Sequence, residues 1–148
     1  MKKILILIIL AFTCTGCYDY KEINDLAIIS AIGVDYDNEK YIITLELLND
    51  QLDKNSSKIT SYTKIGSGDT LTSAIENAAD KLSKQPLFNH IKIMILSDNI
   101  IQNKFDNIID LFLRNTYFRE NFYVVATDNK PEDILKNITE ENPVASNA

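Results

Sequence analysis

The first 17 residues constrain this chain more than any other stretch of it. Two lysines follow the initial methionine, an unbroken apolar run extends over Ile4–Phe12, and small or polar residues lead to Cys17. A positive start, a short apolar core and a zone of small residues are the parts of a secretory signal peptide. A membrane-spanning helix needs roughly 20 apolar residues, which this run does not reach. We therefore predict that residues 1–16 are a cleaved signal and not a transmembrane helix.

The end of this signal resembles a bacterial lipobox, in which the cysteine is lipidated and becomes the first mature residue. Thr15 and Gly16 before Cys17 fit that pattern, and Cys14 stands where leucine is usual. The chain has two cysteines, so cleavage before Cys17 leaves one thiol without a disulfide partner. The alternative is an ordinary secreted protein with an unmodified cysteine at its start. We predict that Cys17 is the lipidation site, because a diacylglyceryl group accounts for the thiol and provides a lasting membrane anchor.

The charge of the remaining chain limits its partners. The formal charge of the whole chain is −6, and it becomes −8 when the two lysines of the signal are removed. Binding of nucleic acid requires clustered lysine or arginine to neutralise phosphates, so an acidic domain of this kind is not expected to bind it. An anionic membrane surface would repel the domain mildly. Attachment to the membrane is therefore expected to come from the lipid alone.

Hydrophobic patterns in the rest of the chain predict one mixed α+β domain over residues 17–138, followed by a polar tail over 139–148. The turn at Asp37–Glu39 joins the first two strands into an antiparallel hairpin. Helices between the later strands imply parallel pairs, so the sheet is mixed and the helices pack on it. In chain order, the predicted strands are 27–34, 40–48, 58–65, 91–96 and 122–126. The first and last are predicted to be buried, the third to be an edge strand and the fourth to be central. The predicted helices are 70–84, about 105–114, and one from Pro131.

Glycines and the single histidine are the first candidates for chemistry. Gly66–Asp69 precedes a helix, but the lysine and serine or threonine of a phosphate loop are absent, so we predict a turn that ends the edge strand, with a helix cap. Gly33 lies inside a strand and predicts a bulge or a close approach of another backbone. The composition does not exclude a Ser–His–Asp catalytic triad that contains His90, although no G-x-S-x-G nucleophile elbow is present. We predict a structural hydrogen bond for His90, no zinc site, no cofactor and no enzymatic activity.

Carboxylates near the start of the mature chain are candidates for a cation site, although their spacing matches no calcium loop. They are Asp19, Glu22, Asp25, Asp35 and Asp37, and solvated charge is the preferred interpretation. Arg114 and Arg119 are the two arginines of the chain. They flank a polar connection, and pairing with the acidic lead-in or a plain surface role remain equal alternatives.

Several segments, taken in order, resemble the Ger(x)C family, the C-subunit lipoproteins of spore germinant receptors. Cys17–Ala27 and Ile32–Asp35 are similar to the family's start, with Tyr18 in place of tryptophan and valine in place of isoleucine before the aspartate. Later matches follow in the family's order: Gly68–Thr70 before a helix, Leu87–Lys92 with its histidine, and Arg114–Tyr123 before the next strand. The resemblance covers residues 17 to about 138.

The resemblance implies a non-catalytic, lipid-anchored subunit on the outer face of the spore inner membrane. Its implied partners are a polytopic A subunit and a transporter-like B subunit, with which it would sense nutrients and trigger germination. It also implies a fold of several mixed α/β domains, of which this chain matches the first. Because family members usually run more than twice this length, we expect the chain to be either a first-domain product or the product of a truncated gene. The alternative is an extracytoplasmic lipoprotein that binds a small molecule in a deep pocket. The sequence does not name the germinant.

Overall fold

The computed structural model describes residues 25–49, 60–115, 118–119 and 121–141, and the mixed α+β class is confirmed. The strands are β1 (Leu26–Asp37), β2 (Lys40–Asn49), β3 (Thr60–Gly68), β4 (Gln85–Leu87), β5 (Ile93–Ser97) and β6 (Tyr123–Thr127). The helices are α2 (Leu71–Ala79), α3 (Asp98–Asn103), α4 (Phe105–Arg114) and α5 (Pro131–Glu141), with a 3₁₀ turn η2 (Phe88–His90).

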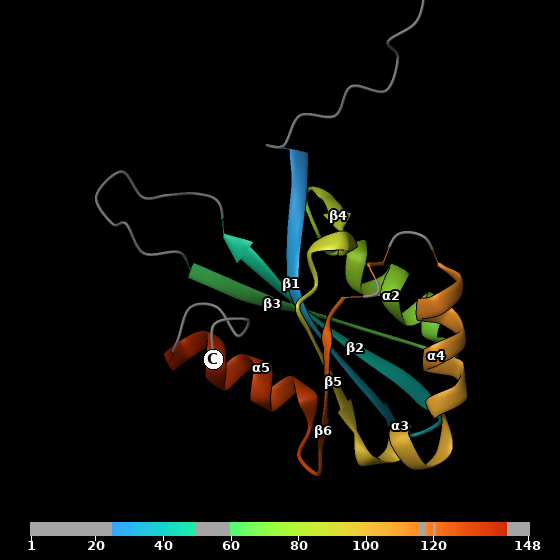
Figure 1. Cartoon of the computed structure of the whole chain (residues 1–148). Helices are drawn as coiled ribbons and strands as arrows, with labels where there is room; N and C mark the ends of the chain where they lie inside the picture. Colours follow the sequence, from blue (N-terminus) through green and yellow to red (C-terminus); the bar gives the residue numbers. More distant parts are fainter. Residues whose placement is uncertain (1–24, 50–59, 116–117, 120, 142–148) are drawn as a thin grey trace, which may run out of the picture.

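The sheet has the strand order β3-β2-β1-β5-β6, and the short β4 pairs with the start of β1 (Figure 1). β1, β2 and β3 are antiparallel, whereas β1, β5 and β6 are parallel. The predicted hairpin is confirmed, since Asp37 pairs with Lys40. The two residues between them, Asn38 and Glu39, have φ angles of 50° and 61°. Two positive φ angles in a two-residue loop match the right-handed twist of the flanking strands.

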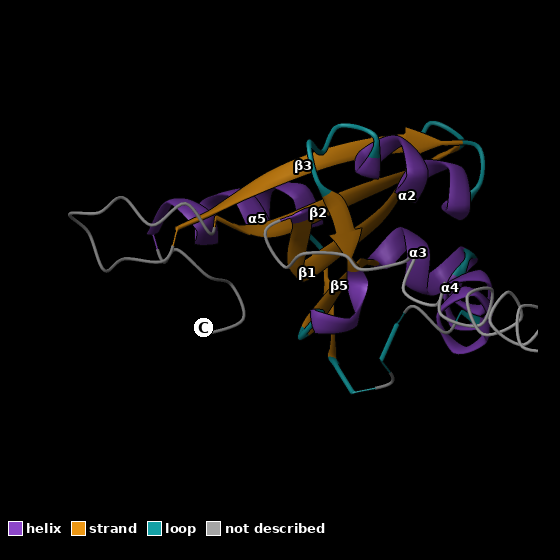
Figure 2. Cartoon of the chain, turned by 90° about the horizontal axis from the view of Figure 1, so that it is seen from above, coloured by secondary structure: helices purple, strands orange, loops and turns teal. Residues whose placement is uncertain are grey.

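Helices cover both faces of the sheet, with α2, α3 and α4 on one face and α5 on the other (Figure 2). Successive side chains of a strand point to opposite faces. On β5, Met94 joins the cluster that contains Phe112 of α4, and the next residue, Ile95, packs against Leu135 of α5. Both central strands, β1 and β5, are therefore buried on their two sides, as predicted from their apolar runs.

Glycines explain how closely the helices approach the sheet. A Cβ atom at Gly33 would lie 2.8 Å from the Cβ of Pro131 at the start of α5, which confirms the predicted close approach. The bulge of β1 lies earlier, between Ile29 and Ala31. A Cβ atom at Gly66 would lie 2.3 Å from the backbone nitrogen of Ala78 in α2. The prediction that the strand breaks at Gly66 is wrong, because β3 continues to Gly68. The missing side chains of Gly66 and Gly68 let α2 lie directly on β3.

Other boundaries were also predicted incorrectly. α2 ends at Ala79, not at about residue 84, and Gln85–Leu87 instead pairs with β1 as β4. A helix that the apolar pattern did not predict, α3, begins at Asp98 directly after β5, where the Oγ of its N-cap Ser97 accepts a hydrogen bond from the backbone nitrogen of Ile100 at 3.4 Å. In both places a tertiary pairing or a side-chain cap overrides the local pattern.

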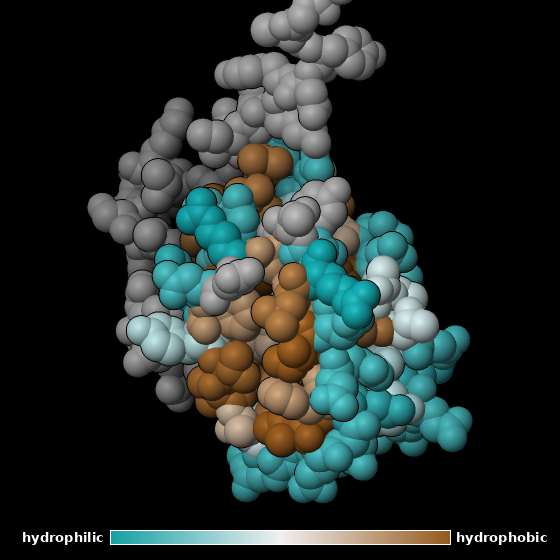
Figure 3. All heavy atoms as spheres, turned by 45° about the vertical axis from the view of Figure 1, so that its right-hand side comes forward, coloured by the Kyte–Doolittle hydropathy of each residue, from teal (hydrophilic) through white to brown (hydrophobic). Residues whose placement is uncertain are grey.

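The strand predicted to be buried at residues 122–126 is exposed. β6 forms one edge of the sheet, and Tyr123, Val124 and Val125 are 79%, 54% and 45% exposed. Figure 3, in which the right-hand side of Figure 1 comes forward, shows apolar side chains gathered over the middle of this face with hydrophilic ones beside them. A run of apolar residues indicates that a strand avoids water, but it does not indicate which neighbour covers it.

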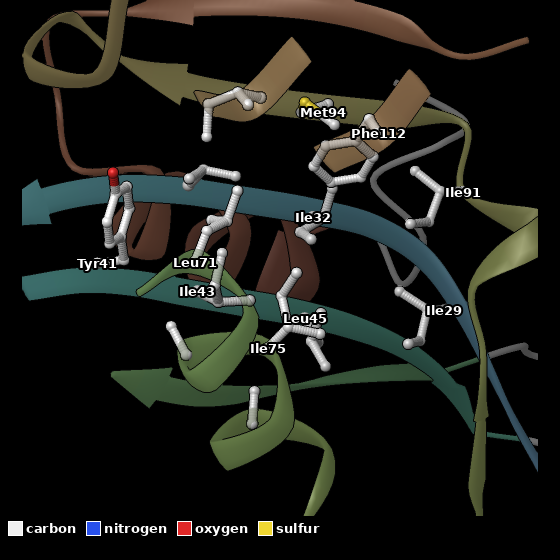
Figure 4. Packing of buried hydrophobic residues seen from close by; sticks show 14 of the residues in the cluster. Ile29, Ile32, Tyr41, Ile43, Leu45, Leu71, Ile75, Ile91, Met94 and Phe112 are labelled. Atoms are coloured by element: carbon white, nitrogen blue, oxygen red, sulfur yellow. The ribbon is translucent and has the colours of Figure 1, made fainter. Parts of the chain in front are cut away.

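The main core lies between the sheet and the three helices α2, α3 and α4. Ile32 of β1, Leu45 of β2, Ile75 of α2 and Phe112 of α4 point toward one another in this layer (Figure 4). The face toward α5 has a smaller apolar core of Ala31, Ile95 and Leu135, with Ile93 and Ile134 packed against it.

Candidate functional site

The carboxyl ends of the three parallel strands meet at one end of the sheet. Loops that follow parallel strands converge there, which is where ligands bind in many open α/β sheets. A shallow depression with a volume of about 240 Å³ lies at this end. It is lined by Asp35 and Asp37 from β1, Ser97 at the end of β5, Asp98 and Asn99 at the start of α3, and Asp128, Asn129 and Lys130 after β6.

Local hydrogen bonds hold the walls of this acidic depression. The Oδ1 of Asp35 accepts from the backbone nitrogen of Tyr36 at 2.8 Å, and the side chain of Asn99 donates to the carbonyl of Tyr36 at 3.2 Å. Across the depression, the backbone nitrogen of Asn129 donates to the Oγ1 of Thr127 at 3.0 Å. The bond from Asn99 joins the start of α3 to the end of β1, whereas the bond at Asn129 lies within the loop after β6. These segments surround a surface with four carboxylates.

The structure brings together only part of the cation site that the sequence suggested. Asp35 and Asp37 line the depression, Asp25 is exposed at the opposite end of β1, and Asp19 and Glu22 lie outside the described residues. Among the described residues, no group of three histidine, cysteine or acidic side chains is placed to hold a metal ion. The arrangement is an acidic surface suited to a basic partner group.

Asp98 and Asp128 were missed by sequence reasoning because they are distant in sequence from Asp35. The signal that would have found them is positional: both follow the end of a predicted strand. If the three strands are taken as parallel, their following residues must share one edge of the sheet. The positions of Asp98 and Asp128 after predicted strands were visible in the sequence, but their proximity to Asp35 follows only once the strand order is known.

The remaining candidates fall in separate places. His90 is exposed in η2, and its predicted hydrogen bond remains a prediction. The predicted helix cap is confirmed one residue after Gly66–Asp69, where the Oγ1 of Thr70 accepts from the backbone nitrogen of Ser73 at 3.1 Å. Cys17 and most of the acidic lead-in lie outside the described residues. Arg114 forms an exposed ion pair with Asp110, one turn earlier in α4.

A buried carboxylate on the α5 side of the sheet was not identified as special from the sequence. Glu46 in β2 is fully buried, and it accepts hydrogen bonds from Ser30 of β1 at 2.7 Å and Ser61 of β3 at 2.9 Å. A buried carboxylate must be satisfied by donors. Glu46 therefore links three neighbouring strands, and its surroundings give it a structural role.

Comparisons with known proteins point in one direction. The model of a family described as "Spore germination protein N-terminal domain" matches residues 19–148. Spore germination protein KC of Bacillus subtilis (strain 168) is 31% identical over 142 residues, which cover 89% of this chain and 35% of that protein. Spore germination protein A3 of the same organism is 29% identical over 152 residues, which cover 98% of this chain and 40% of that protein.

A further relative, spore germination protein B3 of Bacillus subtilis (strain 168), is 24% identical over 146 residues, which cover 95% of this chain and 38% of that protein. The chain thus spans between about a third and two fifths of the length of these three relatives. No solved structure matches the chain.

Proposed function

The chain belongs to the spore germination protein N-terminal domain family, and from that premise we propose that it is a lipid-anchored, non-catalytic subunit of a nutrient germinant receptor. It would act through protein–protein contacts on the outer face of the spore inner membrane. Its partners would be the polytopic A subunit and the transporter-like B subunit that the resemblance implies. The single observation that carries this proposal is the family match over nearly all of the chain after Cys17.

The position of that match supports the proposed anchor. It begins at residue 19, two residues after Cys17, so the signal-like segment precedes the family domain directly. β1 begins at Leu26, and a chain of nine residues spans at most about 30 Å when fully extended. A lipid on Cys17 would therefore hold the start of β1 within about 30 Å of the membrane surface.

This tether suggests an orientation for the domain. β1 has 12 residues, which at about 3.3 Å per residue give a length of about 40 Å. The anchor precedes the amino end of β1, and the acidic depression lies at its carboxyl end. The orientation that keeps these carboxylates far from anionic lipid head groups is also the one of lower electrostatic energy. We propose that the acidic end faces away from the membrane, toward other proteins.

A non-catalytic role agrees with the chemistry of the described residues. Within the ranges that the structure covers, none of the helices has the length and apolar character needed to cross a membrane. The acidic depression brings carboxylates together with Lys130 and with serine and asparagine side chains, whereas His90, the candidate for a catalytic triad, lies elsewhere, in η2.

The alternative, a lipoprotein that captures a small molecule, requires a pocket of at least about 300 Å³ that encloses its ligand. The acidic depression is smaller, at about 240 Å³. A second depression of about 340 Å³ beside Asp110 and Arg114 is wide open and would not enclose a ligand.

The test is a comparison of the natural chain with Cys17→Ala and Cys14→Ala variants in spores that make it. We expect mass spectrometry to find a diacylglyceryl group on Cys17, and palmitate label on the natural chain and on Cys14→Ala. Cys17→Ala should lose the label and leave the membrane fraction. Affinity capture of the anchored chain should recover the polytopic receptor subunits. An unmodified thiol on material free of the membrane would contradict the anchor, and capture without receptor subunits would contradict the receptor role.

A further inference from the structure

In the part of the chain that the structure describes, no strand pairs with the outer edge of β6. β6 pairs with β5 on one side only. The backbone nitrogen of Tyr123 donates to the carbonyl of Lys92 at 2.8 Å, so Tyr123 directs its backbone groups toward β5. Because alternate residues of a strand direct these groups to opposite sides, Val124 and Ala126 direct theirs outward. Two donors and two acceptors are thus arranged for a further strand.

The side chains of β6 are as apolar as those of a covered strand. Tyr123 and Val125 emerge on the α5 face and Val124 on the opposite face, beside Ile93, Ile95 and Met94 of β5. Natural sheets protect their free edges with charges, prolines or covering side chains. An edge with exposed valines and an exposed tyrosine lacks those devices, and tyrosine is enriched among residues that dominate binding energy.

The chain's own next segment is poorly placed to cover this edge. Connections between parallel strands of one sheet are right-handed in nearly all proteins. The connection from β5 to β6 passes through α3 and α4 on one face, whereas α5 lies on the other face. A right-handed connection through α5 leads back toward β5 and β1, not outward past β6. α5 contacts β1, β2 and β3 as well as β5, so it lies over the sheet on the inner side of the free edge.

We propose that the outer edge of β6 binds an extended segment of a partner protein, which adds to the sheet as a further strand. The segment would carry apolar side chains at alternating positions, to cover Tyr123, Val124 and Val125. It would carry lysine or arginine at the end that reaches the acidic depression, because Asp128 follows β6 directly and Asp98 lies in the same depression. This inference rests on the proposed function, since it names the surface through which the receptor contact is made.

Strand addition explains why a polypeptide fits this edge better than another occupant. Main-chain hydrogen bonds supply affinity and alternating side chains supply specificity in this mode of recognition. A lipid or a folded helix would cover the valines but would leave the outward backbone groups of Val124 and Ala126 without partners, which is costly once they are desolvated.

The experiment places the photo-crosslinker benzoylphenylalanine at Tyr123 of the full chain in dormant spores, with Tyr62 as the matched control. Tyr62 is an exposed tyrosine on β3, the opposite edge of the sheet. We expect adducts from position 123 that map to an extended, alternately apolar segment with a basic end in another receptor subunit, and at least tenfold fewer from position 62. Adducts with a second copy of this chain, equal adducts from both positions, or none from position 123 would overturn the proposal.

Two variants test the mode of binding in the same assay. Val124→Pro removes an outward N–H but none of the bonds to β5, so thermal unfolding should change little while adducts from position 123 fall at least tenfold. Asp128→Lys reverses an exposed charge and should lower them about fivefold even if the proline variant folds poorly. Undiminished adducts in both variants would contradict strand addition. A membrane-bound chain with lipid on Cys17 but without adducts would refute this inference alone, whereas an unlipidated chain would refute the proposed anchor.

Discussion

The two edges of the sheet, β3 and β6, differ in how their outward backbone groups are satisfied. At β3, the side chain of Asn77 donates to the carbonyl of Ser67 at 2.8 Å, and the Nζ of Lys81 donates to the carbonyl of Ile65 at 2.6 Å. At β6, the outward backbone groups of Val124 and Ala126 face no strand among the described residues. Side chains of this domain therefore cap backbone carbonyls at the β3 edge. The backbone groups at the β6 edge are instead placed to pair with a strand of another polypeptide.

The largest expected effect concerns how tightly the β3 edge is closed. Gly66→Val places a branched side chain where a Cβ atom already meets the backbone of Ala78. We expect the free energy of unfolding to fall by about 3 kcal/mol, because neither α2 nor β3 can move without losing core contacts. Urea unfolding followed by circular dichroism measures this. A change below 1 kcal/mol would mean that α2 does not press on β3 as described.

The next effect concerns the buried carboxylate that holds β3 to the sheet. Glu46→Ala leaves the hydroxyl groups of Ser30 and Ser61 without this acceptor, and we expect unfolding to become easier by about 2 kcal/mol. Glu46→Gln keeps the length of the side chain and one acceptor oxygen, and it serves as the control with a smaller loss. Equal losses in the two variants would show that the hydrogen bonds at this position contribute nothing measurable.

A smaller effect is expected at the start of the helix that covers β3. Thr70→Ala removes the cap that accepts from the backbone nitrogen of Ser73, and such caps stabilise a protein by about 1 kcal/mol. Thr70→Ser retains the hydroxyl group and should restore most of that stability. Thermal unfolding of both variants checks the prediction, which fails if serine and alanine behave alike.

The smallest effect is expected at β6, where the same type of change as Gly66→Val should be tolerated. Ala126→Val adds a branched side chain to an exposed position of the free edge, and we expect the stability of the isolated chain to change by less than about 0.5 kcal/mol. Together with Gly66→Val, this variant compares how much stability each edge loses when a branched side chain is added. A loss comparable to that of Gly66→Val would mean that β6 is already covered in the isolated chain.

The comparison also explains what could be predicted from the sequence. The hairpin, the central strand and the helical stripes follow from local patterns: alternation over Tyr41–Leu48, a continuous apolar run over 91–96, and apolar residues at helical spacing. The place of a strand in the sheet is not a local property. Residues 122–126 have the composition of a buried strand, and only the strand order shows that, among the described residues, no further strand pairs with the outer edge.

The candidate site was predictable in part for the same reason. Asp35 and Asp37 were candidates because they belong to the group of carboxylates near the start of the mature chain, whereas Asp98 and Asp128 join them only through the parallel pairing of β1, β5 and β6. The break expected at Gly66–Gly68 failed in a different way. The glycines locally favour a turn. They instead lie within β3, because α2 packs so closely on this strand that a side chain at Gly66 would meet its backbone.

The most direct test of the open β6 edge is residue-resolved hydrogen exchange on the isolated full chain in detergent micelles. We expect the amides of Val124 and Ala126 to exchange at least 100-fold faster than those of Tyr123 and Val125, because only the latter pair directs its N–H groups toward β5. Equal protection of all four amides would show that the outer edge is already paired, and would contradict the account.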